Sequence, residues 1–389
     1  MQKRRFPWGQ VAVISFFLVL GLLCGLLLGP RLVLPQGDMV AFSLELLWLL
    51  LAMYLAIFLQ TLLHEAGHLI FGLLTGYRFG SFRIGGFILI MDEERLRFRR
   101  LNIAGTGGQC LMRPPEMVDG KLPVALYNLG GALMNLISGS VFLLIWFLLP
   151  SIPFVSEAML MSAIIGAVYA LVNGIPLKIG VVDNDGSNAL AIGSNRAAMR
   201  AWWIQLKANE YVSKGIRLKD MPDEWFDLPS DEEMKNSVVA TLGVFACNRL
   251  MDEHRFEEAA ALMERLLSAD TAIVDLHRRL LTCDQMYCEL IGEFRKDRLK
   301  ELFSTSQQRF ERSMSKHPGI LRSRYCRELL WECRGRKAAA TLALFDKSAL
   351  TYPYPREIEG ERELIAIAQQ VKKGREEPEI CAEFETELT

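Results

Sequence analysis

Long, uninterrupted runs of apolar residues fill the first half of the chain, whereas the second half has none of comparable length. An apolar run of about 18 residues or more can cross a bilayer as a helix. Four runs are therefore predicted to span the membrane: Val11–Gly29, Ala41–Leu74, Leu126–Leu149 and Phe154–Val172. We expect the first to be a retained anchor rather than a signal peptide, because it is long and no small-x-small cleavage site follows it.

After about residue 206, apolar residues recur at helical spacing among many charges. Two pairs of amphipathic helices are predicted, Val238–Met251 with Phe256–Leu267 and Leu321–Cys333 with Lys337–Asp346. In each pair, the start of the second helix resembles the start of the second helix in a tetratricopeptide repeat. The two starts lie about 80 residues apart, which is not a multiple of that repeat's period of about 34 residues. We expect a degenerate helical-repeat domain that binds a partner protein. A plain helical bundle under the membrane is the alternative.

Alternating residues between the second and third runs predict a β-hairpin. Phe82–Met91 and Leu96–Arg99 are strand-like, and Asp92–Glu94 is a turn. An exposed strand edge can bind an extended peptide by strand addition, although a hairpin that only covers the core fits the pattern equally well. The candidate substrate-binding residues of this hairpin are Gly85, Gly86 and Ile88.

Charge divides the chain in the same way as hydropathy does. Residues 1–205 hold 15 of the 44 Lys+Arg and 11 of the 45 Asp+Glu residues. We expect an N-terminal anchor over 1–39, a membrane core over 40–205, a cytoplasmic helical domain over 206–373 and an acidic flexible tail over 374–389. The expected fold is an all-α polytopic membrane protein with about four spans, a β-hairpin and an α-helical cytoplasmic domain. A formal net charge of −1 gives no case for nucleic-acid binding.

Basic residues mark the loops that stay in the cytoplasm. Lys3, Arg4 and Arg5 precede the first run, and eight Lys and Arg residues lie in the 75–125 loop, whereas the short outer loops have almost none. Both termini and the 75–125 loop are therefore expected in the cytoplasm. The predicted location is the plasma membrane of a bacterium.

The second run carries the sequence His64-Glu65-Ala66-Gly67-His68. Histidines at i and i+4 lie on one face of a helix, so both imidazoles can reach one zinc ion. Glu65 could take a proton from a water molecule at that metal. Ionisable residues inside a membrane span are costly, which favours a functional role over histidines that merely hydrogen-bond across a helix bundle.

A catalytic zinc usually has a third protein ligand. The remaining three histidines all lie in the second half of the chain. After the fourth span, Asn173-Gly174-Ile175-Pro176 is followed by Asp183 and Asp185, which the topology brings to the level of His64. Pro176 interrupts the helix and lets the chain turn back. Gly186 allows close backbone approach beside Asp185, while Asp183 stays open as an alternative.

These motifs together resemble the site-2 protease family of intramembrane zinc metalloproteases. The family has HExxH in a membrane helix, then NxxP with a later Asp-Gly pair. Gly131-Ala132-Leu133-Met134-Asn135 is similar to the family's Gly-Pro-x-x-Asn, with alanine in place of proline. The resemblance covers about residues 40–190. This chain departs from the family by a longer insert, Leu177–Asn184, before the Asp-Gly pair.

The resemblance implies one zinc ion per chain, with Glu65 as the general base. Asn135 and Asn173 would support the site or orient the scissile backbone. The implied zinc ligands are His64, His68 and Asp185.

We therefore expect an intramembrane zinc endopeptidase that cleaves a peptide bond within or next to a substrate's transmembrane helix. The expected partners are that substrate, the lipid bilayer and a protein bound by the helical domain. Three alternatives are a membrane-anchored zincin acting on soluble peptides, a silent relative that only binds transmembrane helices, and a different zinc hydrolase or metal carrier. The intact Glu65 argues against the silent relative.

Overall fold

The computed structural model describes residues 39–92, 95–101, 103, 107–149, 152–176, 184–193 and 195–375. Four sequence predictions lie wholly or mostly outside this part of the chain: the first span Val11–Gly29, the turn Asp92–Glu94, the alternative ligand Asp183 and the tail 374–389. The described residues are mostly helical and include a small antiparallel sheet. They form two compact units.

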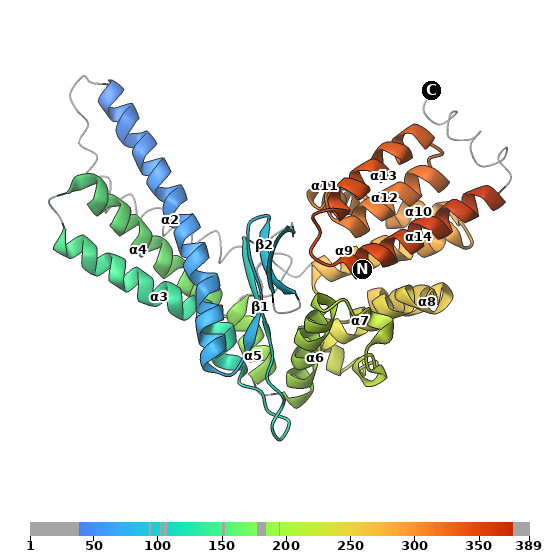
Figure 1. The fold of residues 1–389 in the computed structure, drawn as a ribbon, viewed down its shortest axis with the longest axis horizontal. Helices are drawn as coiled ribbons and strands as arrows, with labels where there is room; N and C mark the ends of the chain where they lie inside the picture. The colour runs from blue at the N-terminus through green and yellow to red at the C-terminus, as the bar shows by residue number, and fades with distance from the viewer. Residues whose placement is uncertain are drawn as a thin grey trace. The chain divides into compact units, whose positions relative to one another are not determined.

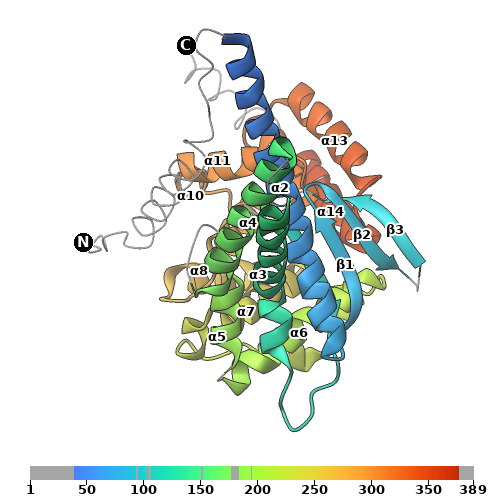
Figure 2. The ribbon, with the colours of Figure 1, turned by 90° about the vertical axis from the view of Figure 1, so that its left-hand side faces the viewer.

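The first unit lies within residues 1–77 and 123–194. Its described helices are α2 (Met39–Leu74), α3 (Val124–Leu148), α4 (Pro153–Gly174) and α5 (Asp185–Gly193). The long helices α2, α3 and α4 pack against one another and run side by side in Figure 1 and Figure 2. Each of the three is long and apolar enough to cross a membrane. The second, third and fourth apolar runs are thus helical, as the sequence predicts.

Helix α2 turns its small and polar residues inward and its large apolar residues outward. The outward residues include Leu47, Tyr54 and Phe58, which are more than half exposed. This is the pattern expected of a helix in lipid, where helix contacts favour small residues and polar groups rather than large apolar ones. The residues at every fourth position that form the inward face are Ala52, Ala56, Gln60, His64, His68 and Gly72.

Glycines allow α2 and α3 to approach closely. A Cβ atom added at Gly67 would lie 2.3 Å from the backbone oxygen of Gly130, and one at Gly130 would lie 2.7 Å from the backbone oxygen of Gly67. The two backbones therefore touch at this level of the bundle, one residue before His68.

The second unit contains a four-stranded antiparallel sheet of order β3-β2-β1-β4. The sheet predicted as one hairpin is thus larger than expected, and the prediction of a single strand over Phe82–Met91 is wrong. The chain reverses at Gly85, where φ is +56°, a conformation that suits glycine in a two-residue turn. The strands of the sheet are β1 (Arg78–Ile84), β2 (Phe87–Asp92), β3 (Arg95–Arg100) and β4 (Gly108–Arg113).

The rest of the second unit is helical, with Asn195 and Asn236 capping its first two α-helices. The helices predicted over 238–251, 256–267, 321–333 and 337–346 are confirmed as α7, α8, α12 and α13, within one to three residues at most ends. The helices of this unit are α6 (Arg196–Ser213), α7 (Ser237–Asp252), α8 (Phe256–Ser268), α9 (Asp275–Ile291), α10 (Lys296–Leu302), α11 (Thr305–Ser313), α12 (Pro318–Leu330), α13 (Gly335–Ala349) and α14 (Pro355–Gly374).

The spacing of these helices explains the irregular repeat in the sequence. Helices α7, α9, α12 and α14 begin 38, 43 and 37 residues apart, and neighbours in this series pack together. The starts of α8 and α13 are therefore two repeats apart, with α10 and α11 between them. Each repeat is longer than a tetratricopeptide repeat of about 34 residues.

The sheet shares its core with these helices. Ile88 of β2 and Leu101 after β3 belong to the same buried apolar cluster as Met263 of α8 and Phe345 of α13. The backbone N–H of Arg100 donates to the carbonyl of Thr351 at 3.0 Å. The second unit therefore contains β1–β4 and α6 together with the helices after residue 206. The sequence instead predicts that residues 40–205, which include the sheet and the start of α6, belong to the membrane core.

Candidate metal centre

The structure brings His64, His68 and Asp185 together in the first unit. The Nε2 atoms of the two histidines on α2 lie 3.2 Å apart. Asp185, the first residue of α5, places its Oδ2 atom 3.1 Å from Nε2 of His64 and 3.4 Å from Nε2 of His68. Among the described residues, these three form the one cluster with metal-ligand spacing, all ligand atoms lying within 4.8 Å of one another.

A hydrogen bond on the far side of each imidazole determines which nitrogen carries the proton. Nδ1 of His64 lies 2.7 Å from Oδ1 of Asn135, and Nδ1 of His68 lies 2.8 Å from the backbone oxygen of Tyr127. Both oxygens can only accept, so each Nδ1 carries the hydrogen and each Nε2 keeps a lone pair. This is how metal-binding histidines are usually oriented.

The donor atoms of this cluster fit a metal cation. Oδ2 of Asp185 is buried and accepts no hydrogen bond from the described residues. Three lone-pair-bearing atoms thus converge without a hydrogen between them, which is unfavourable unless a cation lies there. Two imidazole nitrogens and one carboxylate oxygen form a donor set that Zn²⁺ accepts.

Helix α3 supports His64 through two residues one turn apart. A Cβ atom at Gly131 would lie 2.5 Å from Cε1 and 2.7 Å from both ring nitrogens of His64, so the imidazole rests on bare backbone. Asn135 follows four residues later and accepts the hydrogen of Nδ1. The Gly-x-x-x-Asn pattern therefore has a physical basis here: the glycine leaves room for the ring and the asparagine orients it.

Asn184, which the sequence reasoning missed as a site residue, holds Asp185 in place. Its Oδ1 accepts from the backbone N–H of Ser187 at 2.9 Å, which caps α5. Its Nδ2 donates to the carbonyls of Val172 at 2.6 Å and Ile175 at 2.7 Å, at the end of α4. An asparagine just before a helix start can be recognised in the sequence as a capping residue. The hydrogen bonds that this asparagine makes to α4 cannot be recognised there.

Gly186 completes this junction. A Cβ atom there would lie 2.4 Å from the backbone oxygen of Gly174, so α5 can begin against the end of α4 only with glycine at this position. The close approach that the sequence predicts beside Asp185 is therefore present.

The other two site candidates differ in their surroundings. Glu65 is buried, with 6% of its surface exposed, and follows His64 directly on α2. Asn173 is half-buried, and its Nδ2 donates to the carbonyl of Tyr169 at 3.0 Å, within its own helix. The described contacts of Asn173 do not join it to His64 or Asp185, whereas those of Asn135 do reach His64.

The hairpin residues lie in the second unit. Gly85 and Gly86 form the turn between β1 and β2, and Ile88 is 1% exposed in the apolar core. β2 is paired on both sides, with β1 and with β3, so it offers no edge to a peptide. Among the described strands, β3 pairs only with β2 and is an outer strand.

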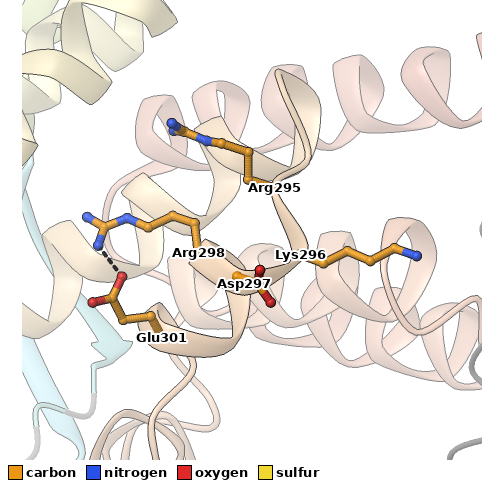
Figure 3. A pocket seen from close by; sticks show the side chains of 5 residues that line it. All are labelled: Arg295, Lys296, Asp297, Arg298 and Glu301. Atoms are coloured by element: carbon orange, nitrogen blue, oxygen red, sulfur yellow. Dashed lines mark hydrogen bonds and ion pairs between the residues drawn. The ribbon is translucent and has the colours of Figure 1, made fainter.

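The second unit also has a polar surface pocket whose arginines already have carboxylate partners. Arg298 pairs with Glu301 at 2.6 Å, as Figure 3 shows, and Arg295 pairs with Glu289 at 2.7 Å. The ion pairs leave little positive charge for an anionic ligand, so we assign no site there. The residues that line this pocket are Arg295, Lys296, Asp297, Arg298 and Glu301.

No protein-family model, curated protein or solved structure matches this chain.

Proposed function

We propose that this protein is an intramembrane zinc endopeptidase that cleaves a peptide bond within or next to a substrate's transmembrane helix. The observation that carries the proposal is the convergence of two histidine nitrogens and the Asp185 oxygen beside helices apolar enough to span a bilayer. A buried, charged cluster of this kind is costly in such helices and is explained by chemistry performed there.

Each polar residue of the site has a role in this proposal. When bound, zinc would be held by His64, His68 and Asp185, would polarise the scissile carbonyl and would lower the pKa of water at the site. Glu65 takes a proton from the attacking water and passes it to the leaving amine. Asn135 keeps the lone pair of His64 Nε2 directed at the site.

The outer strand β3 would hold the substrate in an extended form. A helical substrate must unwind first, because its own hydrogen bonds shield its peptide bonds. The N–H of Arg100 donates away from the sheet, to Thr351. Residues two apart on a strand point the same way, so the backbone groups of Leu96 and Phe98 face the outer edge, where the Phe98 carbonyl accepts from the exposed Arg99 side chain at 3.2 Å. A peptide can add there as a further strand.

The test compares the wild type with Glu65→Gln in membranes that contain candidate substrates. Glutamine keeps the size of Glu65 but cannot accept the proton, and general acid–base groups contribute about 10²–10⁴-fold to rates. We expect normal zinc content, cleavage slowed by at least about 100-fold and intact transmembrane proteins trapped on the variant.

Two outcomes would contradict the proposal. Near-normal cleavage by Glu65→Gln would remove the protease assignment as argued. If the wild type instead retains the same intact helices as the variant and releases no fragments, the protein is a zinc protein that only binds transmembrane helices. His64→Ala, which removes a ligand, is the control for activity that depends on the metal.

A further inference from the structure

Gln60 is a buried polar residue whose place in the metal site has no sequence signature. It lies one helical turn before His64 on the inward face of α2 and is fully buried, at 0% exposure. A glutamine inside a membrane helix needs hydrogen-bond partners, because an unpaired amide there is costly. Its partners form a chain that ends at the metal site.

The chain of hydrogen bonds crosses all three long helices. Nε2 of Gln60 donates to the backbone oxygen of Ser162 on α4 at 2.9 Å. Oε1 of Gln60 accepts from Nδ2 of Asn135 on α3 at 2.8 Å. Oδ1 of Asn135 in turn lies 2.7 Å from Nδ1 of His64 on α2.

The direction of every bond in this chain is fixed by groups that can only accept. The backbone oxygen of Ser162 requires the NH₂ group of Gln60 on its side, which leaves Oε1 toward Asn135. Nδ2 of Asn135 also donates to the backbone oxygen of Gln60 at 2.8 Å. Oδ1 of Asn135 must therefore face His64, and Nδ1 of His64 must carry its hydrogen.

The surroundings of Gln60 are shaped to hold its side chain. A Cβ atom at Gly166 on α4 would lie 2.7 Å from Nε2 of Gln60, so a glycine makes room for the amide. The hydroxyl of Ser138 donates to Oε1 of Gln60 at 3.1 Å, the second bond that this oxygen accepts. The glutamine amide is thus satisfied on both sides and held in one orientation.

We propose that Gln60 is a positioning residue for the metal site. It locks the amide of Asn135, and thereby the tautomer of His64 in which Nε2 binds the metal. The inference rests on the proposed zinc site, but it concerns metal affinity and can be tested without a substrate.

The test is a double-mutant cycle read by zinc or Co²⁺ affinity of the detergent-solubilised full chain. Gln60→Met keeps the length of the side chain and removes its side-chain hydrogen bonds, whereas the bond from Asn135 Nδ2 to the backbone oxygen of residue 60 remains. Loss of an outer-shell partner typically costs 10–100-fold in metal affinity, and we expect about tenfold for Gln60→Met and about 10–100-fold for Asn135→Ala. Because Gln60 acts through Asn135, the double variant should bind no more weakly than Asn135→Ala alone.

Ser138→Ala is the matched control, since it removes a bond to the same glutamine oxygen and leaves the side-chain bonds of Asn135 to Gln60 and His64 in place; of Asn135 it loses only the 3.3 Å contact to the backbone oxygen. It should keep wild-type affinity within about threefold, and the Co²⁺ absorption spectrum should change in Gln60→Met but not in Ser138→Ala. Gln60→Leu serves as a second variant. If both Gln60 variants fail to fold while Ser138→Ala folds, the residue acts in helix packing and the inference is wrong.

Other outcomes separate this inference from the proposed function. Unchanged metal affinity in Gln60→Met, or additive losses in the double variant, would overturn the role of Gln60 and leave the protease proposal intact. The expected losses in a protein that never cleaves a substrate would support Gln60 and overturn the protease.

Discussion

At the scale of single residues, the chemistry of the site depends on hydrogens that lie on the outer side of the two imidazole rings. Asn135 and the Tyr127 carbonyl hold those hydrogens on Nδ1, so both Nε2 atoms face Asp185 as acceptors. A metal cation between them would make this arrangement favourable. Asn135 and Tyr127 thus orient two of the three donor atoms that could hold a metal ion.

The identity of the third ligand gives the first prediction. Asp185→Asn removes the anionic oxygen and should cost more metal affinity than the roughly 10–100-fold that loss of an outer partner costs. Metal analysis of the purified variant should find it largely free of zinc and inactive. Asp183→Asn is the comparison and should retain most of its metal. The reverse pattern would transfer the role of ligand to Asp183.

A second prediction concerns Asn184. Asn184→Ala removes the cap of α5 and both bonds to the end of α4, so Asp185 loses its fixed position. We expect zinc affinity to fall about 10–100-fold, measured by competition with a chelator. Asn195 caps α6 in the same way but makes no bond to α4 that is described. Unchanged affinity in Asn184→Ala, or an equal loss in Asn195→Ala, would contradict the assigned role.

Much of this site could be predicted from the sequence, and the remainder could not for a physical reason. The i, i+4 spacing of His64 and His68 guarantees that their rings meet on one helix face. The partners of these rings lie 71 and 59 residues further along the chain, and Gln60 bonds to Asn135 across 75 residues. Such bonds arise when helices pack, so a local pattern does not reveal them.

At the scale of elements, the packing of α2 against α3 depends on glycine rather than on large apolar side chains. Gly67→Ala would place a Cβ atom 2.3 Å from a backbone oxygen of α3, which cannot move aside as a side chain can. Overpacking of this kind costs about 1–3 kcal/mol. The free energy of unfolding of Gly67→Ala, measured in mixed detergent, should be lower than that of the wild type by this amount. Gly193→Ala, where a Cβ atom would meet nothing within 4 Å, should be neutral, and equal stability of both variants would contradict this packing.

The outer strand β3 carries a prediction about substrate. Leu96→Pro removes a backbone donor from the free edge, while the pairing of β3 with β2 does not use that donor. Cleavage should fall by at least about tenfold with zinc content unchanged, since strand addition depends on these backbone bonds. Leu96→Ala, which keeps the donor, should retain cleavage. If both variants cleave equally well, strand addition at β3 is wrong.

The long helices of the first unit were easier to predict than the sheet. Apolar runs alone place α2, α3 and α4, because a span needs length and hydropathy. The sheet required recognition of the Gly85-Gly86 turn within one apparently continuous strand. The second repeat, which begins with α9, was missed because α10 and α11 break the regular spacing.

At the scale of the whole molecule, the loop charges predict which side of the membrane each segment faces. Cysteines introduced at Val118 and Glu232, both exposed, should be protected from an impermeant thiol reagent added outside intact cells. Ile152→Cys, in the short predicted outer loop, should react. Labelling at Val118 or Glu232 with protection at Ile152 would invert the topology.

The shared core of the sheet and the distal helices has a consequence for biosynthesis. α2 is complete and can enter the membrane soon after residue 74 has been translated, but Arg100 has no Thr351 to bond, and Ile88 no Phe345 to pack near, until about 250 more residues follow. A nascent chain thus carries the HEAGH helix long before its sheet can pack against the distal helices. The strand proposed to bind substrates gains this packing last, so a ribosome-bound or prematurely ended chain would hold the proposed metal ligands without the core that supports that strand.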